Sequence, residues 1–248
     1  RSKSMRVCTK CIKSGRIEGG GQGVPGERPS FMVWPSESVW RRWGFGPEPG
    51  EPFKDTRYPV EHIDQLFCSI TPVYAGAGGQ QTGRRRGRGG RGGGRGGARG
   101  GAGASGADST TSALVALLEK TGPAVLIVHS AAGRAGIEVC RSHPDLVKAL
   151  VVVEPVGAVT DPEEIKDGFA DIPYLAVFGD HFESRRMRGR LDGCQEMARL
   201  IDEAGGKAEI LWLPRLGVHG NTHLLMQDDN SHEIAGRVTA WLKDVLTD

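Results

Sequence analysis

The chain has 248 residues and a formal net charge of +2, which hides a basic segment within an otherwise mildly acidic sequence. Its length allows one sizeable domain with appendages, and no apolar run is long enough to cross a bilayer. Basic residues near the start are not followed by an apolar core, and the five scattered cysteines are odd in number. We therefore expect no signal peptide, no metal site and a reduced, cytoplasmic setting.

The first part of the chain divides by composition into three segments. Residues 1–37 show neither helical nor strand periodicity and are predicted to be disordered. Residues 38–74 are rich in aromatic residues and proline, which predicts a cap-like or loop-rich packing segment with a short helix near Val60–Phe67. Residues 75–107 are a Gly/Arg low-complexity stretch that cannot bury a core, so the folded core is expected over 108–248.

The basic segment lies inside this low-complexity stretch. Its arginines run from Arg84 to Arg99 without an acidic residue, and the pattern resembles an RGG box. Such a run attracts phosphate groups, which gives an alternative function: nucleic-acid binding, with the folded half as a non-catalytic scaffold. No aromatic residue lies between Tyr74 and Phe169 to add base stacking, so nucleic-acid binding through this run is expected to be nonspecific.

Helix and strand patterns alternate through the second half of the chain. In chain order they are a helix after Asp108 or Ser109, a strand over Ala124–Val128, a helix near Ala131–Arg141, strands over 149–154 and 173–180, a helix near Cys194–Ala204, a strand over 208–214 and a last helix capped by Asn230. The first helix is expected to pack through Leu114, Leu117 and Leu118. The alternation predicts an α/β fold, a parallel sheet flanked by helices on both faces.

Polar residues with catalytic potential follow the predicted strands. In an open parallel sheet, functional groups gather at the carboxyl ends of the strands. These ends carry, in chain order, His129 and Ser130, then Glu154, then Asp180, then a loop with His219 and His223. The order serine, acid, histidine is that of an α/β-hydrolase triad.

A serine hydroxyl becomes a nucleophile only when a base takes its proton and a carboxylate orients that base. The backbone N–H of Ala131, after the serine, can point at a developing oxyanion. The pattern departs from G-x-S-x-G, because Val128 and Ala132 stand at the glycine positions and Gly133 comes one residue late. Each residue alone suits a cap, a salt bridge or a loop; their order at successive strand ends favours catalysis.

Four stretches carry a resemblance to a known family: "VHSAAGRAG", "VKALVVVEP", "IPYLAVFGDH" and "LPRLGVHGNTHLLMQDDN". They resemble a branch of the α/β-hydrolases typified by a bacterial esterase, whose nucleophile motif reads H-S-x-S-G. The resemblance implies hydrolysis of a small-molecule carboxylic ester through an acyl-enzyme, without a cofactor. It implies Ser130 as nucleophile, His223 as base and Glu154 as acid, with Asp180 as the alternative acid. His129 and His219 would line the pocket or shape the loop.

The sequence also differs from this branch. No segment before Ser130 reads as the family's early strands or as its H-G-G-like loop, which gives the first oxyanion donor. We therefore expect half a sheet of four strands, with the nucleophile strand at an exposed edge where an oligomer can form. Turnover is expected to be weak or absent. Trp40, Trp43 and Phe45 are candidates for the pocket wall or for ordinary core.

Overall fold

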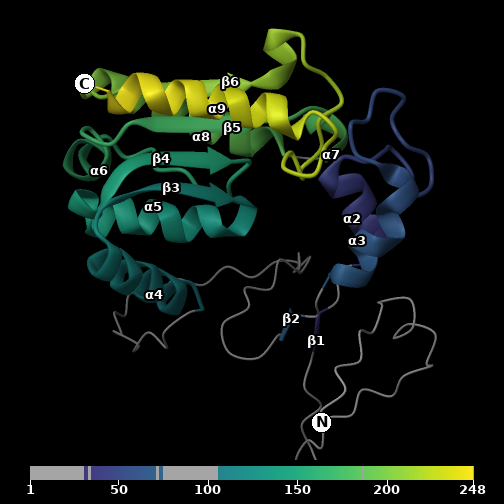
Figure 1. Ribbon diagram of the computed structural model, residues 1–248, viewed down its shortest axis with the longest axis horizontal. Coiled ribbons are helices and arrows are strands. Elements are labelled where there is room, and N and C mark those ends of the chain that lie inside the picture. The colour runs from purple at the N-terminus through teal and green to yellow at the C-terminus, as the bar shows by residue number, and fades with distance from the viewer. Residues whose placement is uncertain (1–30, 33–34, 71–72, 75–105, 186, 248) are drawn as a thin grey trace, which may run out of the picture.

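The computed structural model describes residues 31–32, 35–70, 73–74, 106–185 and 187–247, drawn as coloured ribbon in Figure 1. The predictions made for most of residues 1–37 and 75–107 fall outside these ranges. The RGG-like run from Arg84 to Arg99 is among them, so nucleic-acid binding through it stays a prediction. Among the described residues, no helix is long and apolar enough to span a bilayer.

A parallel four-stranded sheet forms the centre of the described part. Its strands, in spatial order, are β3 (Ala124–His129), β4 (Val147–Val153), β5 (Tyr174–Phe178) and β6 (Ala208–Trp212). Spatial order follows chain order, and all three pairings are parallel. The two central strands are apolar and almost wholly buried, as expected for strands covered on both faces. The predicted α/β class with a parallel sheet is confirmed.

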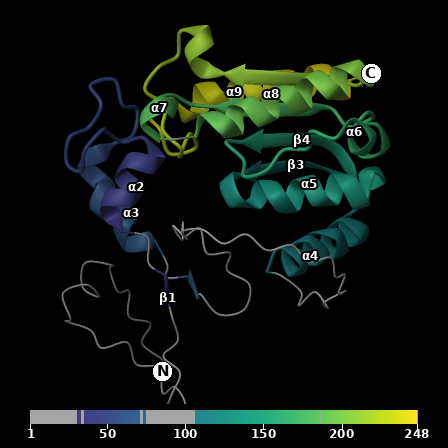
Figure 2. The same ribbon diagram turned by 180° about the vertical axis from the view of Figure 1, so that it is seen from behind.

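Helices cover both faces of this sheet. Helix α9 (Ser231–Leu246) lies on one face, and α5 (Gly133–Ser142) and α8 (Arg188–Glu203) lie on the other, as Figures 1 and 2 show from opposite sides. An outer helix, α4 (Gly106–Thr121), precedes β3. Shorter elements fill the connections: η3 (Pro144–Leu146), α6 (Pro162–Gly168), α7 (Phe182–Arg185) and η4 (Leu213–Leu216). Each helix contributes apolar side chains to one of two cores, one on either side of the sheet.

Some local predictions differ from the structure. In α4, Leu118 is buried, but Leu117 is 54% exposed, because this outer helix packs mainly on α5 rather than on the sheet. Asn230 precedes α9, yet its side chain bonds Asn221 instead of capping the helix. Helix α6 was not expected; the carboxylate of Asp161 begins it by accepting two backbone N–H bonds.

Strand β3 lies at the edge of the described sheet. Its side chains alternate, so that Leu126 and Val128 are buried while Ile127 is 60% exposed. Beside it, a groove of about 380 Å³ opens toward α9; its apolar lining includes Ile127, Val153, Val177, Leu225, Ile234, Val238 and Leu242. The described residues therefore agree with the expected half sheet. Pairing of this edge with another chain stays a prediction.

A second, smaller unit faces the carboxyl ends of the strands (Figure 1). It contains α2 (Ser36–Trp43), η1 (Val60–His62) and α3 (Ile63–Ser69), and a short antiparallel pair, β1 (Phe31–Met32) and β2 (Val73–Tyr74), lies nearby in the chain. Trp40 and Phe45 are buried in a small core together with Leu224 from the last loop of the main domain. These two aromatics are thus core residues, and the helices near 36–70 are attached to the loop that carries His223.

Candidate active site

Three turns at the carboxyl ends of the strands hold unusual backbone conformations. Ser130 follows β3 with a φ of 52°, Glu154 follows β4 with a φ of 42°, and His181 follows β5 with a φ of 59°. These are the three non-glycine residues with positive φ in the described part of the chain. Such conformations cost on the order of 1–3 kcal/mol each, and they persist where the surrounding structure imposes them. They turn the chain sharply at the carboxyl end of the sheet; there the side chain of Glu154 is buried, whereas those of Ser130 and His181 are partly exposed.

The turn at Ser130 is locked against the turn after β4. Ser130 begins the short η2 (Ser130–Ala132), which leads into α5. Its carbonyl accepts the backbone N–H of Val156 at 2.7 Å. A Cβ on Gly133 would lie 2.6 Å from the Cβ of Pro155, so only glycine allows this close approach. The glycine that stands one residue late in the sequence motif is therefore required by packing against the neighbouring turn.

Ser130, His223 and Glu154 form a chain of hydrogen bonds. Ser130 Oγ lies 2.9 Å from His223 Nε2, and Glu154 Oε2 lies 2.6 Å from His223 Nδ1. An ionised carboxylate can only accept a hydrogen bond, so His223 Nδ1 carries a proton and donates the hydrogen bond to Glu154. His223 Nε2 is then the acceptor for the serine hydroxyl. This tautomer is the one in which histidine can take a proton from Ser130.

Glu154 is an ionised carboxylate within the core. Its side chain is 0% exposed. Burial by itself would raise its pKa, but the charge of Arg185 and hydrogen bonds from His223 and Arg185 outweigh burial and lower the pKa from 4.5 to about 2. The carboxylate therefore keeps its negative charge at neutral pH and can stabilise an imidazolium on His223.

His223 is kept neutral in the resting site. Burial lowers its pKa below 6.5; the hydrogen bond and charge of Glu154 oppose this, while the charges of Arg185 and Arg190 add to it. The His129 ring lies beside the His223 ring, with the two imidazole centres 4.5 Å apart. Its Nε2–H donates to the backbone carbonyl of His223 at 2.8 Å. His129 thus holds the histidine loop, and it also lines the apolar groove.

Asp180 and His219 form a separate pair at the surface. Asp180 Oδ2 lies 3.1 Å from His219 Nδ1 and accepts the N–H of Gly220, while its Oδ1 accepts the N–H of His181. His219 is exposed. The structure therefore places Glu154, rather than Asp180, beside His223, and it places His219 at the outer end of the same loop.

Asp228 holds the loop that carries His223 in place. This buried carboxylate accepts the backbone N–H and the hydroxyl of Thr222, at 2.8 and 2.7 Å, and the amide of Asn221 at 2.9 Å. In addition, the carbonyl of Trp43 in α2 accepts the backbone N–H of His223 at 2.7 Å. The Trp43 ring lies 6.1 Å from the imidazole. Of the three aromatics proposed for the pocket, Trp43 is the one beside the site.

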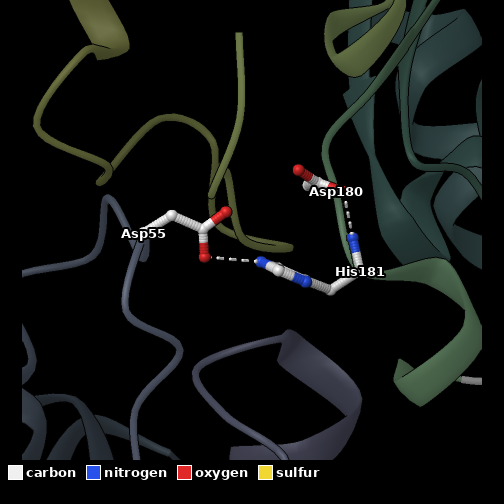
Figure 3. A group of neighbouring side chains, drawn as sticks. All are labelled: Asp55, Asp180 and His181. Carbon is white, nitrogen blue, oxygen red and sulfur yellow. Dashed lines mark hydrogen bonds and ion pairs between the residues drawn. The ribbon is translucent and has the colours of Figure 1, made fainter.

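The small unit also meets the main domain through a charged cluster, shown in Figure 3. His181 Nε2 lies 3.1 Å from Asp55 Oδ1, and its ring stacks on Phe53 with centres 3.7 Å apart. Asp55, Asp180 and His181 offer potential metal-ligand atoms within 4.8 Å of one another. In the described structure these groups already partner one another, which explains them as a bridge between the two units.

Sequence reasoning missed two residues that act on this site, Arg185 and Asp228, and it did not foresee that the backbone carbonyl of Trp43 holds the histidine loop. Arg185 lies in a basic run, "SRRMRGR", in which no local pattern separates a buried arginine from an exposed one. Asp228 lies in "QDDN", a polar stretch in which each residue is expected to be an exposed loop residue. The "GVHGNTH" stretch gave the only sequence signal for such contacts, because a loop with so specific a sequence needs particular partners to hold it.

Comparisons with known proteins found a lipase and an esterase that are similar to this chain. No protein-family model matches the chain. A probable secreted lipase, phiG, from a fungal species (strain ATCC 74256) is 26% identical over 182 residues, which cover 55% of this chain and 50% of the lipase. The structure of a bacterial esterase superposes with a TM-score of 0.73 at 28% identity, covering all of this chain and 67% of the esterase. The chain thus spans half the length of the fungal relative and two thirds of the esterase.

The fold and these two likenesses show that the chain belongs to the α/β-hydrolase superfamily. The fungal relative is described as secreted, so the cytoplasmic setting expected for this chain stays a prediction.

Proposed function

We propose that this protein is a serine hydrolase that cleaves carboxylic esters through an acyl-enzyme. Ser130 is the nucleophile, His223 the base, Glu154 the orienting acid and the N–H of Ala131 an oxyanion donor. The observation that carries the proposal is the continuous hydrogen-bond chain from Ser130 Oγ through His223 to Glu154. The likeness to an esterase and to a lipase supports the same class of reaction.

The reaction follows from the protonation states of these groups. Ser130 Oγ attacks the ester carbonyl carbon while its proton moves to His223 Nε2, and the resulting imidazolium is stabilised by Glu154. The tetrahedral oxyanion meets the N–H of Ala131, which lies in the first helical turn, where backbone amides have no intrahelical acceptor. His223 then gives its proton to the departing alcohol, and water, activated by His223, releases the acid and restores the serine.

The predicted lack of the first oxyanion loop makes turnover a poor first assay. A missing donor costs about 10²–10³ in rate, whereas covalent labelling requires mainly an activated serine. With a fluorophosphonate probe, Ser130 Oγ attacks phosphorus, fluoride leaves and the serine proton passes to His223. We expect labelling of the full chain that disappears in Ser130→Ala and persists in Ser142→Ala, an exposed serine at the end of α5. No labelling of the folded wild-type chain would contradict the proposal.

The identity of the acid needs its own pair of variants. Glu154→Gln keeps the size of the side chain but removes the charge beside His223, so labelling should fall steeply. Asp180→Asn changes the carboxylate that lies beside His219, and labelling should persist. The reverse pattern would make Asp180 the acid of the reaction.

A further inference from the structure

Arg185 is a fully buried arginine next to the proposed triad. Its side chain is 0% exposed, and it stands at the end of α7, the short helix after β5. We propose that Arg185 is a positioning residue, which fixes the carboxylate of Glu154 in the orientation that serves His223 and balances its charge. This inference rests on the proposed function, because Arg185 is argued to act through the proposed triad of Ser130, His223 and Glu154.

The contacts of Glu154 leave its carboxylate one orientation. Oε1 accepts the N–H of Gly179 and Nη1 of Arg185, each at 2.9 Å. Oε2 accepts from His223 Nδ1 at 2.6 Å and from Arg185 Nη2, which is the second hydrogen bond of the ion pair. Two parallel bonds from a planar guanidinium define the plane of a carboxylate, which a lysine ammonium cannot do. The fork therefore points Oε2 at His223.

Arg185 is itself held on several sides. Its Nη1 also donates to the carbonyl of Asp180 at 2.8 Å, and its Nε donates to the carbonyl of Arg42 in α2 at 3.3 Å. Its side chain passes over Gly44, where a Cβ would lie 2.8 Å from Arg185 Cδ. The guanidinium is thus fixed by the turn after β5 and by the small unit together.

The charge of Arg185 acts directly on the base. Its Nη2 lies 3.4 Å from His223 Nδ1, and both atoms are donors when Glu154 is ionised. The charged and titratable groups around His223 are Glu154 after β4, Arg185 of α7, Arg190 of α8, His129 of β3 and Asp228 in its own loop. Glu154 raises the pKa of His223, whereas Arg185 and Arg190 lower it. Without Arg185, the imidazolium should form at higher pH.

The pH dependence separates positioning from mere structural support. The second-order rate of fluorophosphonate labelling is measured from pH 5 to 9 for the full chain, Arg185→Met and Arg185→Lys, with thermal unfolding as a check of folding. In Arg185→Met, the midpoint of the rising limb should move up by about one pH unit, and the plateau rate should fall by up to about 100-fold, because the carboxylate is misplaced. Arg185→Lys keeps the charge and loses the fork, so its rate should fall while its midpoint stays near wild type.

The matched control is Arg188→Met, three residues along the chain, whose exposed side chain pairs with Asp192; its rate and midpoint should equal those of wild type. A folded Arg185→Met variant with the wild-type rate and midpoint would overturn the inference and leave the proposed function intact. Wild-type chain that is not labelled at Ser130 would overturn the proposed function itself. If Arg185→Met does not fold, a folded Arg185→Lys variant with the wild-type rate would refute the role of the fork.

Discussion

Gly220 offers the sharpest test of the idea that the small unit fixes the loop carrying His223. Its φ is +79°, and a Cβ there would lie 1.6 Å from the carbonyl oxygen of Asp55. An ordinary contact between these atom types is about 3.4 Å, so Gly220→Ala must push the two backbones apart by roughly 2 Å. The carbonyl of Gly220 also accepts the N–H of Arg57 at 2.9 Å, a bond that this displacement breaks.

The expected cost has two parts. Alanine in the left-handed region costs about 1–2 kcal/mol, and loss of the bond to Arg57 adds about 1 kcal/mol. Gly220→Ala should therefore lower the free energy of unfolding by about 2–3 kcal/mol. His223 is three residues away, so a displacement of this size should also slow labelling of Ser130 by up to about 100-fold.

Gly217 in the same loop provides the matched control. Its φ is +73°, but nothing lies within 4 Å of the Cβ that an alanine would add. Gly217→Ala should therefore show the backbone cost alone, about 1–2 kcal/mol by urea unfolding, with labelling close to wild type. Equal losses of stability and equal labelling in the two variants would refute the view that contact with the small unit positions the histidine loop.

Two further predictions concern buried carboxylates. Glu154 has a lowered pKa in the folded chain, so between pH 4.5 and about 2 the unfolded chain binds more protons than the folded chain. The free energy of unfolding should therefore fall, on the order of 3 kcal/mol, as the pH drops through this range. A free energy of unfolding that stays flat from pH 5 to 3 would contradict this prediction. Asp228→Ala leaves the donors of Thr222 and Asn221 buried without an acceptor, so the free energy of unfolding in urea should fall by about 3 kcal/mol or more. Asp229 is exposed, and Asp229→Ala should be nearly neutral. Equal effects of the two substitutions would argue against the role of Asp228.

Much of the fold follows from short-range sequence patterns. The run that becomes β4 is rich in valine and the run that becomes β5 is wholly apolar, which suits short strands covered on both faces. Glycine and proline pairs mark the ends of the intervening helices. Leu117 shows where this fails, because a helix pattern cannot tell whether the helix packs on the sheet or only on another helix.

The candidate site is less well determined by sequence. The order of polar residues at strand ends predicted that Ser130, Glu154 and His223 gather at one edge, since parallel strands bring their carboxyl ends together. Glu154 and Asp180 were both acceptable as the acid, because each follows a strand. The path of the loop over 221–225, held by Asp228 and by the Trp43 carbonyl, decides which carboxylate the imidazole meets.

The sequence by itself therefore determined the parallel α/β sheet, its helices and the small set of residues from which a site could be built. Tertiary structure decided that Glu154 lies beside His223, that Asp180 pairs with His219 at the surface, and that Arg185 is buried against the carboxylate. The physical reason is one of range. Periodicity reports the environment of neighbouring residues along the chain, whereas the pairing of buried charges depends on segments that meet only when the whole domain has packed.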